Sequence, residues 1–204
     1  RRQHGTYAQS GRGGLRRRAF SRAHPPFGVE LETLGDATGG PPIRLDWQRF
    51  SYAGKFVMTN TGKGLFRAGE SGDGEFDESV VAAVAFNEDR TDDRTAWLRY
   101  VTVRRDRRGE GLGARLCELV SDDLLDSYDR VKIAVNNPFA YEALYKAGFG
   151  FTGETTGIAE LVLQRPHDAD AAAYRTGLTR YRERDLSEAE RSFLDGRTEP
   201  PGER

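Results

Sequence analysis

The stretch "VRRDRRGEGLGARL", from Val103 to Leu116, carries the most information about the fold of this chain. It places Gly109, Gly111 and Gly113 between a run of arginines and a helix-like sequence. Glycine in a helix costs roughly 1 kcal/mol relative to alanine, so glycines at alternate positions need a reason. A glycine-rich turn between a strand and a helix leaves backbone N–H groups open at the positive end of the helix dipole. The stretch therefore predicts a phosphate-binding turn.

Two common nucleotide-binding motifs do not fit this turn. No Gly-Lys-Ser/Thr follows the glycines, and they lack the G-x-G-x-x-G spacing with an acidic residue about twenty positions later. A phosphate-binding turn of another kind is therefore expected.

The elements around the turn follow a mixed α/β order. An amphipathic helix of about fifteen residues is expected from Leu112, because apolar residues recur there every three or four positions. A second helix is expected over 138–147, with Pro138 in its first turn. Apolar or β-forming runs predict the strands, at 27–35, one or two within 43–66, then 79–86, 96–103, 130–135, 149–154 and 159–164.

Two motifs of this region resemble those of the GNAT superfamily, the acetyl-CoA-dependent N-acyltransferases. The run "RGEGLG" at 108–113 resembles its Arg/Gln-x-x-Gly-x-Gly/Ala motif after a strand. Asn137, Ala140, Tyr145 and "AGF" at 147–149 resemble its N-x-x-A, Y, G-F segment after the next strand.

The resemblance covers roughly residues 79–164 and implies the GNAT fold, with acetyl-CoA as cofactor. We expect a mixed, mostly antiparallel central sheet with helices on both faces. The N-terminal part is atypical, because it is β-rich and shows no pair of amphipathic helices between Leu34 and Val80, where the family usually has one.

The resemblance also implies the cofactor contacts. Exposed backbone of Val101 and Val103 would pair with the pantetheine arm, and the N–H of one of them would polarise the thioester carbonyl. Asn137 would either hydrogen-bond near the cofactor or cap the helix that Pro138 opens. Backbone amides of the turn would hold the pyrophosphate, the residues being Arg108, Gly109, Gly111, Leu112 and Gly113.

Acetyl transfer to an amine needs an acid for the departing thiolate and a base for the ammonium. The family's acid is often a tyrosine four residues before the glycine of "GF", where this chain has Leu144. Tyr145 and Tyr141 are the nearest candidates. The remaining alternative is that these tyrosines serve only packing, or that a water molecule is the acid. No carboxylate lies within 96–103, so the base is sought among the acidic residues of the N-terminal half, Glu30, Glu32 and Asp46.

The acceptor is expected to be a small-molecule or peptide amine. The segment 46–64 is rich in aromatic and hydrogen-bonding side chains, including Trp47, Phe50, Tyr52 and Asn60. These residues line the acceptor site or form a β-rich core layer.

Composition excludes some partners and suggests three regions. The net charge of −1 argues against a general nucleic-acid binder. The sequence contains no run of about 18 apolar residues, so no membrane partner is expected. Residues 1–24 hold seven arginines and no acid and are expected to be a disordered basic arm. The acetyltransferase domain is expected over 25–166. Residues 167–204 are expected to form a helical extension and a flexible tail, and the helical part is expected to pack on the domain or to form a homodimer contact.

Cys117 is the only cysteine, which favours a reducing cytoplasm, and with scattered histidines it gives no reason to expect a metal site. Since Cys117 falls inside the motif helix, we expect direct attack in a ternary complex rather than a covalent enzyme intermediate. A catalytically inactive CoA-binding sensor or interaction module is the alternative. A nucleic-acid-associated protein acting through the basic arm is a third hypothesis.

Overall fold

The computed structural model describes residues 28–202 except 70, 71, 73 and 169. The basic arm expected at 1–24 lies outside the described residues. The described residues form a seven-stranded sheet in the order β1-β2-β3-β4-β5-β7-β6. The strands are β1 (Glu30–Leu34), β2 (Gly62–Arg67), β3 (Val80–Glu88), β4 (Thr95–Val103), β5 (Arg130–Val135), β6 (Gly150–Thr155) and β7 (Leu161–Arg165).

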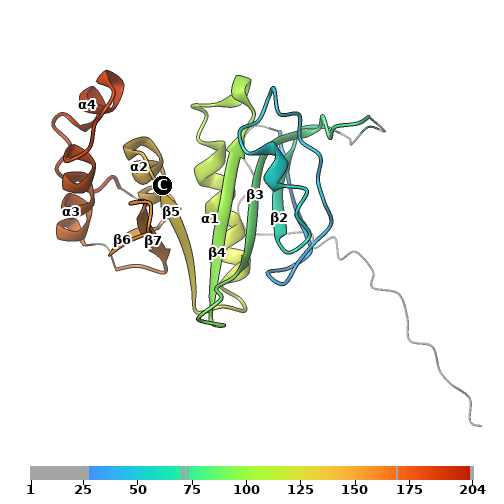
Figure 1. Cartoon of the computed structure of the whole chain (residues 1–204), viewed down its shortest axis with the longest axis horizontal. Helices are drawn as coiled ribbons and strands as arrows, with labels where there is room; N and C mark the ends of the chain where they lie inside the picture. Colours follow the sequence, from blue (N-terminus) through green and yellow to red (C-terminus); the bar gives the residue numbers. More distant parts are fainter. Residues whose placement is uncertain (1–27, 70–71, 73, 169, 203–204) are drawn as a thin grey trace, which may run out of the picture.

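The sheet consists of two antiparallel halves joined by a single parallel pair of strands. β4 and β5 run parallel, and α1 (Leu112–Leu124) supplies the crossover that parallel neighbours require. Their pairing begins at Thr95 with Arg130 and ends at Leu98 with Ile133. Beyond that point the two strands diverge toward their C-terminal ends (Figure 1). The expected mixed, mostly antiparallel sheet is confirmed.

Helix α1 covers one face of the first half. Its apolar residues Leu112, Leu116, Val120 and Leu124 recur every fourth position and are all buried in the main core. Gly64 of β2 lies under this helix, and a Cβ there would come within 2.4 Å of the Val120 side chain. The helix therefore packs close to the strands that precede the glycine-rich turn.

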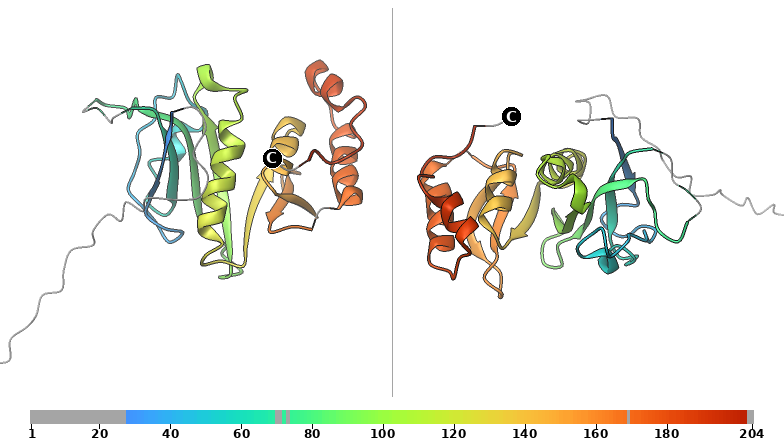
Figure 2. Two further views of the ribbon diagram at one scale, coloured as in Figure 1. Left: turned by 180° about the vertical axis from the view of Figure 1, so that it is seen from behind. Right: turned by 90° about the horizontal axis from the view of Figure 1, so that it is seen from above.

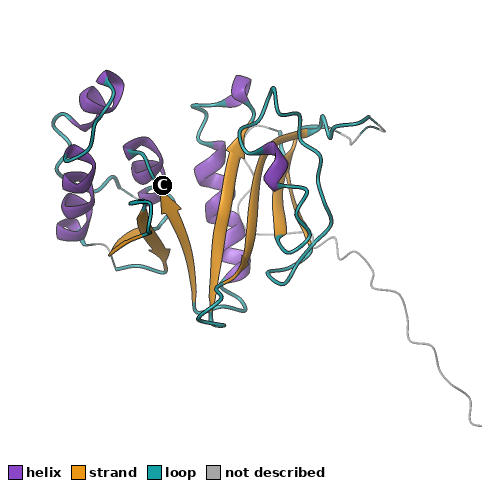
Figure 3. Ribbon diagram, in the orientation of Figure 1, coloured by secondary structure: helices purple, strands orange, loops and turns teal. Residues whose placement is uncertain are grey.

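The opposite face of this half is covered mainly by the irregular segment 35–61, which includes the single 3-10 turn η1 (Ala53–Lys55) (Figure 3). Phe50 and Phe56 of the segment are buried against β2 and β3. Of the strands expected within 43–66, one is found, β2 at the end of the range. Phe50 and Phe56 before it pack as a loop layer. Lys63 of β2 is buried and holds this loop by donating hydrogen bonds to the carbonyls of Met58 and Thr61.

The second half carries α2 (Pro138–Tyr145), α3 (Ala171–Arg182) and α4 (Glu188–Leu194) (Figure 2). Tyr174, Leu178 and Tyr181 of α3 are fully buried in the same core as α1 and α2. The helical extension therefore packs on its own domain. Its end packs there too, since the Arg197 guanidinium lies 2.8 Å from the Glu142 carboxylate on α2.

None of the helices in the described part of the chain has the length and apolar character that a membrane crossing requires.

Candidate active site

A β-bulge in β4 marks the centre of the candidate site. Leu98 pairs with Phe86 of β3 and Tyr100 pairs with Ala85, so Arg99 is an extra residue without a partner in that register. A bulge bends a strand and increases its twist. It therefore accounts for the separation of β4 from β5 directly after Leu98. From Arg99 to Val103, the edge of β4 that faces β5 has no strand partner in the described structure.

The glycine-rich turn follows this free edge. After the 3-10 turn η2 (Arg105–Arg107), Gly109 and Gly111 adopt left-handed backbone angles, with φ of 84° and 77°. Other residues rarely adopt this conformation, which explains both glycines. A Cβ on Gly109 would meet nothing within 4 Å, so open space lies beside the turn.

Gly113 has a different reason. A Cβ at this position would lie 3.2 Å from the Val103 side chain. Gly113 therefore allows the first turn of α1 to approach the end of β4. Packing of helix on strand explains this glycine.

The backbone N–H groups of the turn are unused. From Arg108 to Gly113, none of them donates a hydrogen bond to another described residue. Gly111 is the N-cap of α1 and provides no side-chain cap, so these donors lie at the positive end of the helix dipole. Such an arrangement binds phosphate, and a pyrophosphate group fits it.

The arginines around the turn divide into two kinds. Arg104 pairs with Asp106 at 2.7 Å, and Arg107 pairs with Glu110 at 2.8 Å. Arg108 has no carboxylate partner among the described residues and donates instead to the Ser51 hydroxyl at 2.9 Å. Of these three, Arg108 is therefore the one whose charge is left for an anionic ligand.

Asn137 caps α2. Its Oδ1 accepts a hydrogen bond from the N–H of Ala140 at 2.9 Å, and its backbone carbonyl accepts from Tyr141. Of the two roles expected for Asn137, the cap is present in the structure. A cofactor contact stays a prediction.

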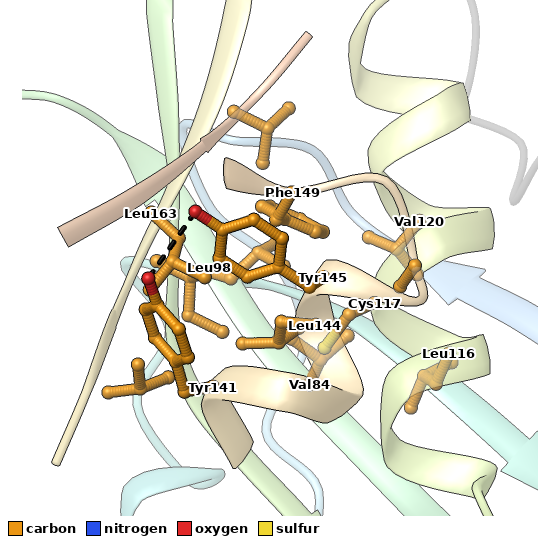
Figure 4. Packing of buried hydrophobic residues seen from close by; sticks show 14 of the residues in the cluster. Val84, Leu98, Leu116, Cys117, Val120, Tyr141, Leu144, Tyr145, Phe149 and Leu163 are labelled. Atoms are coloured by element: carbon orange, nitrogen blue, oxygen red, sulfur yellow. Dashed lines mark hydrogen bonds between the residues drawn. The ribbon is translucent and has the colours of Figure 1, made fainter. Parts of the chain in front are cut away.

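The two candidate tyrosines lie in the core (Figure 4). Tyr141 is fully buried, and its hydroxyl donates to the carbonyl of Tyr174 at 3.1 Å and lies 3.3 Å from the Tyr145 hydroxyl. The Tyr145 hydroxyl accepts from the backbone N–H of Phe151 at 2.8 Å. Burial raises the pKa of both phenols, most strongly that of Tyr141. Both hydroxyls therefore have structural partners, and Leu144 between them is buried as well.

The acidic residues considered as a base are placed unfavourably. Glu30 and Glu32 lie on β1, and β2 and β3 separate that strand from β4. The Glu32 carboxylate is paired with Arg67 at 2.5 Å, and the Asp46 carboxylate accepts from the N–H of Gln48. These contacts make the two carboxylates parts of local structure.

The aromatic residues of the N-terminal half divide between core and surface. Phe50 is buried, whereas Trp47 and Tyr52 are 67% and 58% exposed. Asn60 lines a surface pocket beside the bulge of β4. The segment 46–64 therefore contributes both to the core layer and to a candidate acceptor surface.

Cys117 lies inside α1 and is 1% exposed. Burial raises the pKa of its thiol to about 12, which keeps it protonated near neutral pH. A buried, protonated thiol is poorly suited to act as a nucleophile.

With this geometry established, the comparisons identify the family. Residues 44–151, more than half of the chain, match the model of the Acetyltransferase (GNAT) family. The chain belongs to this family, whose members use acetyl-CoA as the acetyl donor.

Solved structures of acetyltransferases are also similar. An acetyltransferase from Thermus thermophilus is 21% identical over 52% of this chain and 64% of its own, with a TM-score of 0.42. Nourseothricin acetyltransferase is 15% identical over 68% of this chain and 98% of its own, with a TM-score of 0.44. PaiA N-acetyltransferase from Thermoplasma acidophilum, solved in complex with coenzyme A, is 13% identical over 52% of this chain and 60% of its own, with a TM-score of 0.39. No curated protein sequence matches the chain.

Proposed function

We propose that this protein is an acetyl-CoA-dependent N-acetyltransferase that moves the acetyl group to a primary amine by direct attack in a ternary complex. One observation carries the proposal: the unused backbone N–H groups from Arg108 to Gly113 directly follow the unpaired edge of β4. A pyrophosphate bound at the turn leaves the rest of the donor molecule next to that edge.

Each part of the site then has a task. The N–H groups of the turn and the Arg108 guanidinium bind the phosphates, and the β4 backbone holds the extended arm as an added strand would be held. Acetyl-CoA supplies the activated thioester. The N–H of Val101 or Val103 donates to the thioester carbonyl and stabilises the negative charge that develops on its oxygen during attack.

Tyr145 is the first candidate for the acid, and Tyr141 is the second. Tyr145 is 6% exposed and Tyr141 is fully buried, so Tyr145 needs the smaller rearrangement to reach a departing thiolate. The Tyr145 phenol is protonated at neutral pH, as an acid must be before it donates, and the burial that raises its pKa makes it a weaker acid. A water molecule is the alternative proton donor.

Direct transfer is supported by the state of Cys117. The protein mixed with acetyl-CoA alone is expected to keep its mass, because no accessible thiolate exists to accept the acetyl group. Intact-mass spectrometry checks this, and an added acetyl group on Cys117 would contradict the ternary mechanism.

The proposal is tested first by titrating the protein with acetyl-CoA in a calorimeter. Binding is expected, followed by thiol release when a panel of primary amines is added. A folded protein that binds no acetyl-CoA would refute the proposed function.

A catalytically inactive CoA-binding module is the second candidate. It is favoured by the burial of Leu144 and Tyr141 and by the structural partners of both tyrosine hydroxyls. Binding of acetyl-CoA without thiol release from any amine of the panel is its expected result.

A further inference from the structure

We propose that the acceptor of this enzyme carries a carboxylate group, which the Arg99 guanidinium binds in a pocket at the β4 bulge. The inference rests on the proposed function, because it names the class of amine that reaches the same site. Four features of the structure support it.

The first feature is the position of Arg99. It is the extra residue of the bulge, at the point where β4 leaves β5. Bulges near active sites often redirect a side chain. Here the guanidinium lies over the Trp97 ring, 4.9 Å from its centroid, so both side chains lie on the same side of the strand.

The second feature is a pocket of about 410 Å³ at the bulge. Trp97 and Tyr100 of β4 lie on the face of the sheet opposite α1. The residue after each of them, Leu98 and Val101, belongs to the core under that helix. The pocket is lined by β4, by the end of β3 with the turn after it, and by the loop before β2, and its residues include Asn60, Asn87, Asp89, Arg90 and Arg99.

An amine held in this pocket approaches the thioester from the face of the sheet that α1 does not cover. The donor, in contrast, is anchored by the N-terminus of α1. Donor and acceptor then meet at the free edge of β4 without competing for the same surface.

The third feature is the incomplete pairing of Arg99. Its Nε donates to the Asn87 Oδ1 at 2.6 Å, and no carboxylate oxygen of a described residue lies within 4.0 Å of the guanidinium. Arg99 is an exposed residue. Its two terminal nitrogens therefore remain available to a planar, two-oxygen group such as a carboxylate.

The fourth feature is the charge of the residues that line the pocket, where two arginines, Arg90 and Arg99, face one carboxylate, Asp89. Lys55 lies 5.5 Å from the Tyr100 ring centroid. Lys132 lies 6.0 Å from the Trp97 ring centroid, but its ammonium is paired with the Glu154 carboxylate at 3.6 Å. Lys63 of β2 pairs with Ala85 of β3, which in turn pairs with Tyr100 of β4. The Lys63 ammonium donates hydrogen bonds to two backbone carbonyls.

Asp89 is the one carboxylate among the lining residues, and it is already engaged. It accepts hydrogen bonds from the Trp97 indole N–H and from Thr91. The Asp89 carboxylate and the Arg99 guanidinium also attract each other electrostatically, without a contact within 4.0 Å. The pocket is thus cationic with one fixed negative charge, which suits a singly charged carboxylate better than a phosphate dianion.

The experiment measures binding with product-like probes, so that it does not depend on turnover. N-acetyl derivatives of glycine, leucine and phenylalanine, each as free acid and as amide, are titrated into the protein saturated with CoA. At least one free acid is expected to bind about tenfold to a hundredfold more tightly than its amide, the range for a charge-assisted hydrogen-bonded pair.

Variants locate the effect. Arg99→Gln is expected to remove the preference for the free acid, and Arg99→Lys to keep part of it, because lysine keeps the charge and loses the fork. Arg191→Gln, at an exposed position of α4, is the control and is expected to keep the full preference. Thermal melting of each variant shows that it is folded.

The outcomes separate the two proposals. CoA binding with no preference for any free acid, or a preference that survives in Arg99→Gln, overturns the carboxylate inference and leaves the proposed function intact. Failure of the native protein to bind CoA or acetyl-CoA refutes the proposed function itself.

Discussion

The N-termini of α1 and α2 both follow a strand of the same sheet, yet their first backbone N–H groups have different partners. At α1, Gly111 provides no cap, and the donors from Arg108 to Gly113 make no hydrogen bond to another described residue. At α2, the Asn137 side chain accepts from Ala140, and Pro138 has no N–H to satisfy. An uncapped helix end thus leaves backbone donors for a ligand, while at a capped end the side chain of the cap already uses them.

The largest effect on the open end of α1 is expected when Gly111 is replaced with valine. A β-branched side chain at a φ of 77° is strained and would occupy space beside the open donors. Losing one or two charge-assisted bonds to phosphate corresponds to about a hundredfold in affinity, so calorimetry with acetyl-CoA should show at least this loss.

Gly148 after α2 is the matched control, because it also has a left-handed φ, of 80°. Gly148→Val is expected to lower the melting temperature and leave the affinity for acetyl-CoA within a few-fold. Equal losses of affinity in both variants would mean that backbone strain alone explains the result.

The second test distinguishes the tyrosines of α2. If Tyr145 is the acid, Tyr145→Phe lowers kcat by about a hundredfold or more with little change in KM. Tyr141→Phe should change kcat by only a few-fold, since its hydroxyl donates to the Tyr174 carbonyl inside the core. Steady-state thiol release measures both, and similar kcat values in the two variants would exclude Tyr145 as the acid.

The third test concerns α3, whose Gly177 lies against Tyr141 of α2. A Cβ on Gly177 of α3 would lie 2.0 Å from the Tyr141 hydroxyl, so Gly177→Val should lower the free energy of unfolding by about 1–3 kcal/mol. Thr176→Val, at an exposed position of the same helix, is the control. Urea unfolding measures the difference, and acetyl-CoA affinity should stay unchanged below the transition. A Gly177→Val protein as stable as the control would show that α3 does not pack as described.

The smallest expected effect is that of Asn137→Ala. Losing the hydrogen bond to the Ala140 N–H should cost about 1 kcal/mol of stability, whereas Asn137→Asp keeps an acceptor and should cost less. Affinity for acetyl-CoA is measured on both variants. A large loss of affinity in either one would show that Asn137 contacts the cofactor in addition to capping the helix.

Much of the sheet was predictable from local patterns. The strands at 79–86, 96–103 and 130–135 were expected within two residues of their observed ends, because each is an apolar run bounded by polar turns. The segment 43–61 was harder, since its aromatic residues alternate as they do in a strand. Phe50 and Phe56 pack instead in a loop layer, which is held by a buried lysine whose partners are two backbone carbonyls.

The candidate site was predictable only in part. Gly109 and Gly111 have the left-handed angles that a phosphate-binding turn uses, while Gly113 serves the approach of α1 to Val103. Arg99 could not be recognised in the sequence, because nothing in "WLRYV" distinguishes a bulged residue from an ordinary one. The cross-strand register that creates the bulge involves β3, which is a separate part of the chain.

Local sequence patterns predict the features that depend on neighbouring residues: the strand, glycine turn and helix around 103–116, and the Asn137-Pro138 start of α2. These follow from backbone conformation and short-range hydrogen bonds. Three other features are visible in the folded chain alone: the point where β4 separates from β5, the core partners of the tyrosine hydroxyls, and the position of Arg99 over Trp97 beside a pocket. Those properties depend on contacts between segments far apart in the chain, which no local pattern encodes.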